Sequence, residues 1–239
     1  MLRCRIASGC TVLGVLVVAG CTGGGAGFRG TILAEKRYKV EAALAPGKSL
    51  AFPADMPLNV HDKLSTQTPG PDGTARGDAG AEPAGNAVCN AEASKGGSAM
   101  GRFHVGHCLD NRTDASLLAD VEFTVEYEVD ANCVVTAQTV AAQADAAAAG
   151  PLAVVTLTAI IKDSNEKIIQ TMSLANESDD LGRVRKQGTE TARFSVEMEP
   201  SLAYTIALVG EATVTTSAND QATASVAIKK LAITVTGRS

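Results

Sequence analysis

The chain has 239 residues, of which 45% are hydrophobic and 3% are aromatic, and it contains no tryptophan. This length and apolar fraction suffice for one sizeable core, whereas the scarcity of aromatic rings argues against a site that stacks sugars or quaternary ammonium groups. The formal net charge is −5, and the acidic residues are spread along the chain, which disfavours a nucleic-acid partner and implies no charged substrate.

The first twenty residues have the order of a secretory signal peptide. Arg3 and Arg5 give a positive start, an apolar run follows to Ala19, and small residues end it. The run is about ten residues long, whereas a helix needs about twenty to cross a bilayer. A short buried helix is the alternative, but the terminal position and the glycine-rich residues 23–27 argue against it. We therefore expect a cleaved leader over residues 1–20.

Residues 16–21, Leu-Val-Val-Ala-Gly-Cys, resemble the lipobox of bacterial lipoproteins, with small residues at the two positions before the cysteine. The resemblance implies cleavage before Cys21, a diacylglycerol on its thiol and acylation, for example with palmitate, of the new amino terminus. Two or three acyl chains hold a protein firmly, because each buried methylene contributes about 0.8 kcal/mol. Thr22 is not the aspartate that often retains such proteins at the inner membrane. An outer-membrane destination is therefore implied where the cell has two membranes.

Residues 21–27 would form a flexible tether, and the stretch that follows alternates as a strand does. Tyr38, Val40 and Leu44 share one face, against Lys39 and Glu41 on the other. From about residue 65 to 100 the chain turns to glycine, alanine, proline and short polar residues. Such a segment buries too little apolar surface to offset the entropy of ordering it. We expect a long mobile insertion there.

A clear period of two begins at Phe103. Between residues 120 and 130, Val121, Phe123 and Val125 alternate with acidic residues, which is typical of a half-buried antiparallel strand. Similar patterns occupy residues 133–140, 152–161, 167–174, 191–198, 202–209, 212–216 and 222–235. Residues 162–166 predict a polar hairpin turn. The apolar parity changes at Lys229 and Lys230, which predicts a β-bulge or a corner.

The pattern as a whole predicts an all-β protein: one antiparallel two-sheet β-sandwich over residues 28–239, carrying a long disordered insertion. The alanine-rich residues 141–149 are the one stretch that competes for a helix, and they could also form a loop.

Two histidines and a cysteine lie close together in the sequence at His104, His107 and Cys108, and with Cys89 they could bind zinc or copper. On a regular strand His104 and Cys108 share one face while His107 points to the other. Only a turn or bulge at Gly106 would let them converge, so surface or edge histidines are the more common explanation.

Outside the cytoplasm, one disulfide and one spare thiol are expected among Cys89, Cys108 and Cys133. If residues 103–109 and 117–129 form a hairpin, Cys108 lies near its turn and Cys133 beyond its far end. That separation is about 40 Å, against about 5.5 Å between the Cα atoms of a bridged pair. We therefore expect Cys89 to bridge Cys108, with Cys133 as a small buried side chain.

Two acidic groups could bind calcium. The first is a regular row of acidic residues on one strand: Asp120, Glu122, Glu126, Glu128 and Asp130. Such a row is more often the solvated side of a sheet than a calcium site. Asp179 and Asp180 lie in an expected loop at residues 175–188, which could fold around an ion. Neighbouring arginines could simply pair with them.

The common enzymatic signatures are missing, and no nucleophile can be identified near His61, His104 or His107. We expect a non-enzymatic cell-envelope lipoprotein without a cofactor, held to a membrane by Cys21 and displaying its sandwich for structural or adhesive contact, with an envelope protein as partner. The alternatives are a metal-ion-binding module, using residues 104–108 or Asp179 and Asp180, and a hydrolase whose catalytic residues converge only on folding. The sequence does not indicate the oligomeric state.

Overall fold

Strands form wherever apolar and polar residues alternate. The computed structural model describes residues 10–12, 36–134, 151–179 and 182–238, in which all regular structure is strand. The first seven strands are β1 (Cys10–Val12), β2 (Lys36–Tyr38), β3 (Ala42–Leu44), β4 (Ser49–Phe52), β5 (Val60–Thr68), β6 (Ala75–Ala81) and β7 (Ala87–Ser94). The others are β8 (Ser98–Asn111), β9 (Leu117–Val134), β10 (Leu152–Asp163), β11 (Ile168–Asp179), β12 (Arg183–Met198), β13 (Ala203–Thr215) and β14 (Gln221–Gly237). Over these ranges the chain forms no apolar helix of membrane-spanning length.

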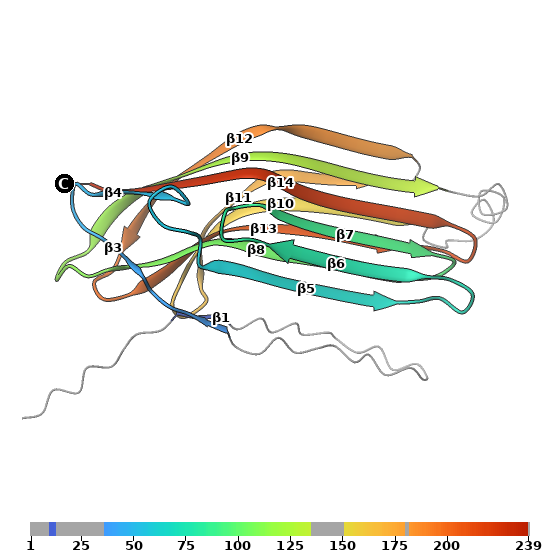
Figure 1. Ribbon diagram of the computed structural model, residues 1–239, viewed down its shortest axis with the longest axis horizontal. Helices are drawn as coiled ribbons and strands as arrows, with labels where there is room; N and C mark the ends of the chain where they lie inside the picture. Colours follow the sequence, from blue (N-terminus) through green and yellow to red (C-terminus); the bar gives the residue numbers. More distant parts are fainter. Residues whose placement is uncertain (1–9, 13–35, 135–150, 180–181, 239) are drawn as a thin grey trace, which may run out of the picture.

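The long strands make two sheets that pack face to face (Figure 1). Sheet 1 has the order β11-β10-β13-β8-β3, and β5 also pairs with β8. Sheet 2 has the order β12-β9-β14-β7-β6, and β4 also pairs with β14. All the pairs are antiparallel except β3 with β8. The expected antiparallel two-sheet β-sandwich is confirmed.

The core lies between the sheets and follows the predicted period. On β9 every second residue is buried, including Val121, Phe123 and Tyr127, while the acidic residues between them face outward. Each fully buried side chain of this size contributes about 1.5–3 kcal/mol. The strand expected at residues 120–130 is therefore confirmed, and it extends to eighteen residues.

The expected mobile insertion at residues 65–100 is wrong, because this stretch forms parts of β5 to β8. Its inward positions carry alanine and glycine, so the two sheets approach until their backbones touch. A Cβ on Gly77 would lie 2.3 Å from the carbonyl oxygen of Met100, and one on Gly101 would lie 2.3 Å from that of Asp78. Sheets separated by large side chains lie about 10 Å apart. Small residues here indicate close packing and not disorder.

Several boundaries also differ from expectation. The strands expected at residues 202–209 and 212–216 are one strand, β13, and β11 and β12 are longer than predicted. β8 and β9 lie in different sheets, so they are not the hairpin that we assumed. Most of the strand expected at residues 133–140 lies outside the described residues, as do residues 141–149 and 21–27.

Two local predictions are confirmed. In β14, Ile228 pairs with Tyr127 while Lys230 pairs with Glu126, so Lys229 is the extra residue of a β-bulge. The turn between β10 and β11 is closed by Asp163, whose Oδ1 accepts hydrogen bonds from the backbone N–H groups of Asn165 at 2.8 Å and Lys167 at 3.0 Å.

A second, smaller apolar cluster covers part of the outer face of sheet 1. It consists of Tyr38, Val60, Cys108, Ile160, Ala203 and Ala207, with Val40 and Val209 packed against it. Tyr38 ends β2, which pairs with β1, so the amino-terminal part of the described chain lies on this face.

Candidate functional site

The structure does not bring His104, His107 and Cys108 together. His107 stacks on Phe52 within the inter-sheet core, whereas Cys108 belongs to the cluster on the outer face of sheet 1. β8 stays regular through Gly106, which pairs with Ala207, so no bulge reverses the alternation. Among the described residues, no three His, Cys, Asp or Glu side chains gather closely enough to hold a metal ion. The residues therefore do not form the metal site that the sequence allowed.

His107 is fully buried, and among the described residues neither ring nitrogen makes a hydrogen bond of regular geometry, although the ring lies near the backbone of Pro57. Burial lowers its pKa, although the backbone of Pro57 and the charge of Glu41 act in the opposite direction. His104 is half-buried on the other face of β8. Burial, together with the positive charges of Lys162 and Arg102, lowers its pKa to about 4. Both imidazoles are thus neutral at pH 7.

The expected disulfide between Cys89 and Cys108 is also wrong. Cys89 faces the inter-sheet core from β7, while Cys108 faces away from that core on β8. No disulfide joins these residues in the part of the chain that the structure describes. The prediction rested on a mobile segment that could bring Cys89 to its partner, and β7 is instead a paired strand. Burial raises the pKa of the Cys89 thiol to about 12.

Cys133 is buried, as expected, and it is bonded to Asp179. Its backbone N–H donates to Asp179 Oδ2 at 2.9 Å, and its thiol donates to the Asp179 carbonyl oxygen at 3.1 Å. Asp179 Oδ1 accepts from the backbone N–H of Gly182 at 2.8 Å. One carboxylate oxygen of Asp179 therefore ties the end of β11 to β9, and the other holds Gly182 directly before β12, while Asp180 lies outside the described residues.

The outer surface of sheet 2 is a flat polar face, which we call the open face. It is made by the outward residues of the five strands β12, β9, β14, β7 and β6, among them Asp120, Glu122, Glu128, Asp130, Arg183, Arg185, Arg193, Thr223, Thr234 and Thr236. The acidic row predicted on β9 lies here. Four of its five carboxylates, those of Asp120, Glu122, Glu128 and Asp130, pair with cations, which supports the interpretation of a solvated sheet surface over that of a calcium site.

The ion pairs on the open face are short and mostly link β9 to its neighbour β12. Arg193 Nε donates to Glu122 Oε2 at 2.6 Å, and Arg183 Nε donates to Asp130 Oδ1 at 3.1 Å. Glu128 pairs with both Arg185 and Lys229. Each pair crosses between neighbouring strands, so the charges alternate in sign across the sheet.

Asp120 is the most heavily bonded carboxylate of the face. Arg238 donates to both of its oxygens at 2.7 Å, and Ser195 Oγ donates to Oδ1 at 2.6 Å. These hydrogen bonds lower the pKa of Asp120 to about 2. They border a shallow hollow of about 460 Å³ whose floor includes Thr234 and Thr236.

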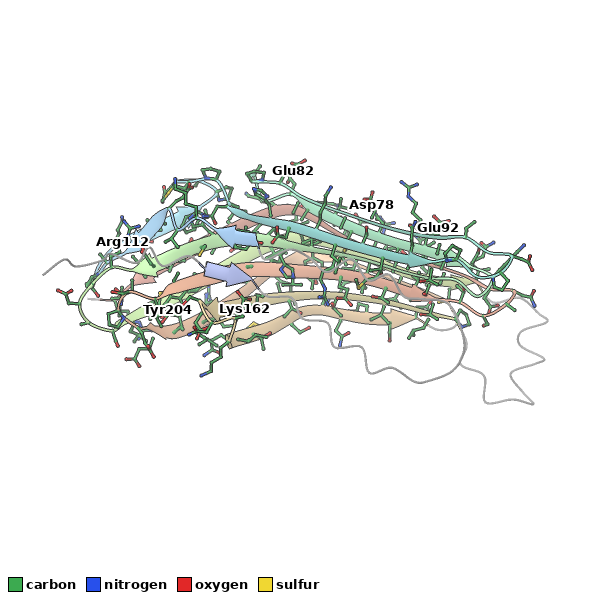
Figure 2. All side chains as sticks on the ribbon, turned by 90° about the horizontal axis from the view of Figure 1, so that it is seen from below. Asp78, Glu82, Glu92, Arg112, Lys162 and Tyr204 are labelled. Carbon is green, nitrogen blue, oxygen red and sulfur yellow. The ribbon has the colours of Figure 1, made fainter. Side chains whose placement is uncertain are left out.

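Sequence reasoning missed the part of this face that β6 and β7 contribute. A second hollow of about 450 Å³ is lined by Asn90 and Glu92 of β7, together with Asp130 and Arg183. Figure 2 shows Glu92 and Asp78 on the β6–β7 side of the molecule, away from Lys162. The available signal was the alternation of Val88, Asn90 and Glu92 with Cys89 and Ala91, but small inward residues such as alanine indicate a core only weakly.

A scan against protein-family models found no match to the chain, and a search of the curated proteins found no relative. The interpretation of the open face therefore depends on its geometry.

Proposed function

We propose that the protein is a cell-envelope lipoprotein, anchored to a membrane through Cys21, that displays its β-sandwich for structural or adhesive contact and performs no catalysis. The observation that carries the proposal is the difference between the two outer faces of the sandwich. One face receives the chain's own amino-terminal segment, and the other is polar, ordered and uncovered by any described residue.

The attachment is on sheet 1. Tyr38 is buried in the cluster on its outer face, and Val40 packs beside it. Cys21 precedes β2 by fifteen residues, a length of chain that spans at most about 50 Å. The chain from a lipid anchor at Cys21 would therefore reach the sandwich on the sheet 1 side, which leaves the open face of sheet 2 free for contact.

The open face suits contact with a polar partner. Exposed ion pairs contribute little to folding stability, but those between Arg193 and Glu122 and between Arg238 and Asp120 hold their side chains in defined positions. Threonines Thr223, Thr234 and Thr236 add hydroxyl groups between the charged rows. Side chains ordered before binding reduce the entropy lost on association.

Within the described residues, the fully buried histidine, His107, is not placed to act as a catalytic base. His107 contacts Phe52 with its ring face, and its nitrogens reach no hydroxyl or thiol in the described ranges. The metal-binding alternative lacks a cluster of ligands in the same ranges, so we propose no second function.

The anchor is tested by intact mass and membrane fractionation of the full chain expressed in a bacterium. Wild type should lose residues 1–20, gain acyl mass and sediment with membranes, whereas Cys21→Ala should stay uncleaved and unlipidated. Cys89→Ala is the matched control and should behave as wild type. Cleavage would also remove β1, the partner of β2. Wild type and Cys21→Ala that are processed alike and released without lipid would refute the anchor.

The contact surface is tested by binding of the protein to isolated cell envelopes. A variant with Arg185→Glu and Arg193→Glu reverses two charges on the open face and should lower the bound amount at least about tenfold, since like charges facing each other across an interface cost several kcal/mol. Arg112→Glu alters an exposed arginine near one end of the sandwich (Figure 2) and should bind as wild type. Equal loss in both variants would argue against the open face as the contact surface.

A further inference from the structure

The sandwich has two lateral sides, and they are built differently. On one side β5 and β6 face each other across the sheets with backbones in contact, since a Cβ on Gly77 would lie 2.7 Å from the carbonyl oxygen of Thr66. On the other side, β11 and β12 are linked through long side chains, with 3.7 Å between Lys186 Nζ and Glu177 Oε1. The unpaired edges of β11 and β12 therefore border the more open side.

Edge strands invite pairing with other chains, and charged side chains, β-bulges or very short strands normally prevent it. β12 carries six charged residues along its length, and Lys186 and Glu190 occupy inward positions opposite Val129 and Val125. β5 and β6 each carry charges, and β3 and β4 have only three and four residues. All these edges are protected.

β11 has the longest uncharged stretch among the described edge strands. Residues 168–176, Ile-Ile-Gln-Thr-Met-Ser-Leu-Ala-Asn, contain no charge, no proline and no glycine. Ile168 is 54% exposed and Met172 is 38% exposed. Two β-bulges, facing Leu157/Thr158 and Ile161/Lys162 on β10, leave the stretch from Gln170 to Ser173 regular between them. This stretch is an edge suited to receiving another strand.

The sequence around Met172 is complementary to itself. When two antiparallel copies of β11 meet on a two-fold axis at Met172, Thr171 lies opposite the partner's Ser173, a pair whose hydroxyl groups can hydrogen-bond. Further out, the same register brings Lys167, directly before β11, toward the partner's Glu177, whose carboxylate also contacts Lys186 of its own chain, so the same opposite-charge pair can form at both ends. A two-fold interface must be complementary to itself in this way.

We infer that β11 is the interface of a homodimer, in which two copies of this chain pair their β11 edges antiparallel about Met172 and join their sheets 1 into one continuous sheet. The occupant of the edge is a second copy because the uncharged centre and the Lys167–Glu177 pairs both satisfy the two-fold register. The interface is separate from the open face, so the dimer would present two open faces on one side.

Cysteine cross-linking of the full chain in membranes tests the register. Only a residue on the two-fold axis meets its own copy, so Met172→Cys should form a covalent dimer on mild oxidation at least about tenfold faster than Thr189→Cys, an exposed position on the neighbouring edge strand β12. Equal rates, or faster cross-linking at Thr189→Cys, would overturn the proposal.

Sedimentation of the purified full chain tests the pairing itself. Wild type should be a dimer, and Met172→Lys should be a folded monomer whose melting is cooperative but no longer depends on protein concentration. Lys167→Glu should weaken dimerisation by about tenfold, and adding Glu177→Lys should restore it, because the double change re-forms both opposite-charge pairs. A wild-type monomer, a Met172→Lys dimer, or a failure of the double variant to recover would each overturn the inference.

Discussion

His107 and Phe52 stack across the inter-sheet core, with ring centroids 4.0 Å apart and an angle of 18° between the planes. His107 lies on β8 of sheet 1 and Phe52 on β4 of sheet 2, so this contact joins the two sheets beside the segment that carries β3 and β4. A neutral imidazole fits this apolar site, whereas a protonated one would carry an unpaired charge into the core.

Protonation of His107 should therefore destabilise the fold. Its pKa is lowered in the folded state, so the unfolded chain binds more protons, and stability should decrease as the pH falls below about 6.5. His104, with a pKa of about 4, should act in the same direction between pH 6.5 and 4. Each histidine contributes up to about 1.4 kcal/mol per pH unit. The pH dependence of the free energy of unfolding is measured by urea unfolding at several pH values. The proteins compared are wild type, His107→Phe, His104→Gln and the double variant.

The double variant is the decisive comparison. Its free energy of unfolding should depend least on pH between pH 6.5 and 4. The slope for each single variant should lie between that of the double variant and that of wild type. An unchanged slope in His107→Phe would mean that the ring is already solvated in the folded protein.

Close backbone contact between the sheets predicts a large effect of one methyl group. Gly101→Ala would place a Cβ 2.3 Å from the carbonyl oxygen of Asp78, and overpacking of this kind costs about 1–3 kcal/mol or more. Gly188→Ala is the control, since no atom lies within 4 Å of its added Cβ, and alanine is favoured over glycine in a strand by about 0.5–1 kcal/mol. In denaturant unfolding, the free energy of unfolding should be lower than that of wild type for Gly101→Ala and higher for Gly188→Ala. A neutral Gly101→Ala would contradict the packing of β6 on β8.

The Asp120 carboxylate should titrate with a pKa of about 2, because Arg238 and Ser195 hydrogen-bond to its charged form. Removing one donor with Arg238→Gln should raise the pKa toward the ordinary value of about 3.9. Carbon-detected NMR titration of the side chain measures both values. Arg76→Gln changes a charge on β6 at the opposite end of sheet 2 and should leave the pKa of Asp120 as it is in wild type. An equal shift in that variant would point to a general charge effect.

The Cys89 thiol should be unreactive in the folded protein, since it is buried and its pKa is raised to about 12. Iodoacetamide without reductant at pH 8 should modify Cys89 only after unfolding. Peptide mapping by mass spectrometry then reports its state directly. Recovery of a peptide pair linking Cys89 to Cys108 would show that the disulfide forms and that β7 or β8 is placed incorrectly.

Period-two alternation was the most informative part of the sequence. It located β9, β10 and the end of β14, because large apolar residues on one face and charged residues on the other have no other low-energy arrangement. The bulge at Lys229 was visible as a change of parity. The same rule failed for β6 and β7, where the buried face carries alanine and glycine, and whether such a face is core depends on how closely the opposite sheet approaches.

The candidate site, too, was only partly predictable from the sequence. The acidic row on β9 was predicted as a solvated surface, but its partners Arg183 and Arg193 come from β12 and Arg238 from the end of the chain, which only the pairing register brings together. The separation of Cys89 from Cys108 likewise follows from the sheet that each strand joins.

By itself, the sequence determined that the chain forms strands, which residues face the core on the longest of them, and that its first residues resemble a lipoprotein leader. Only the tertiary structure decided which strands became neighbours, which edges stayed open and which charges met. These depend on contacts between residues far apart in the chain, and local patterning cannot specify them because every amphipathic strand presents the same alternation to any partner.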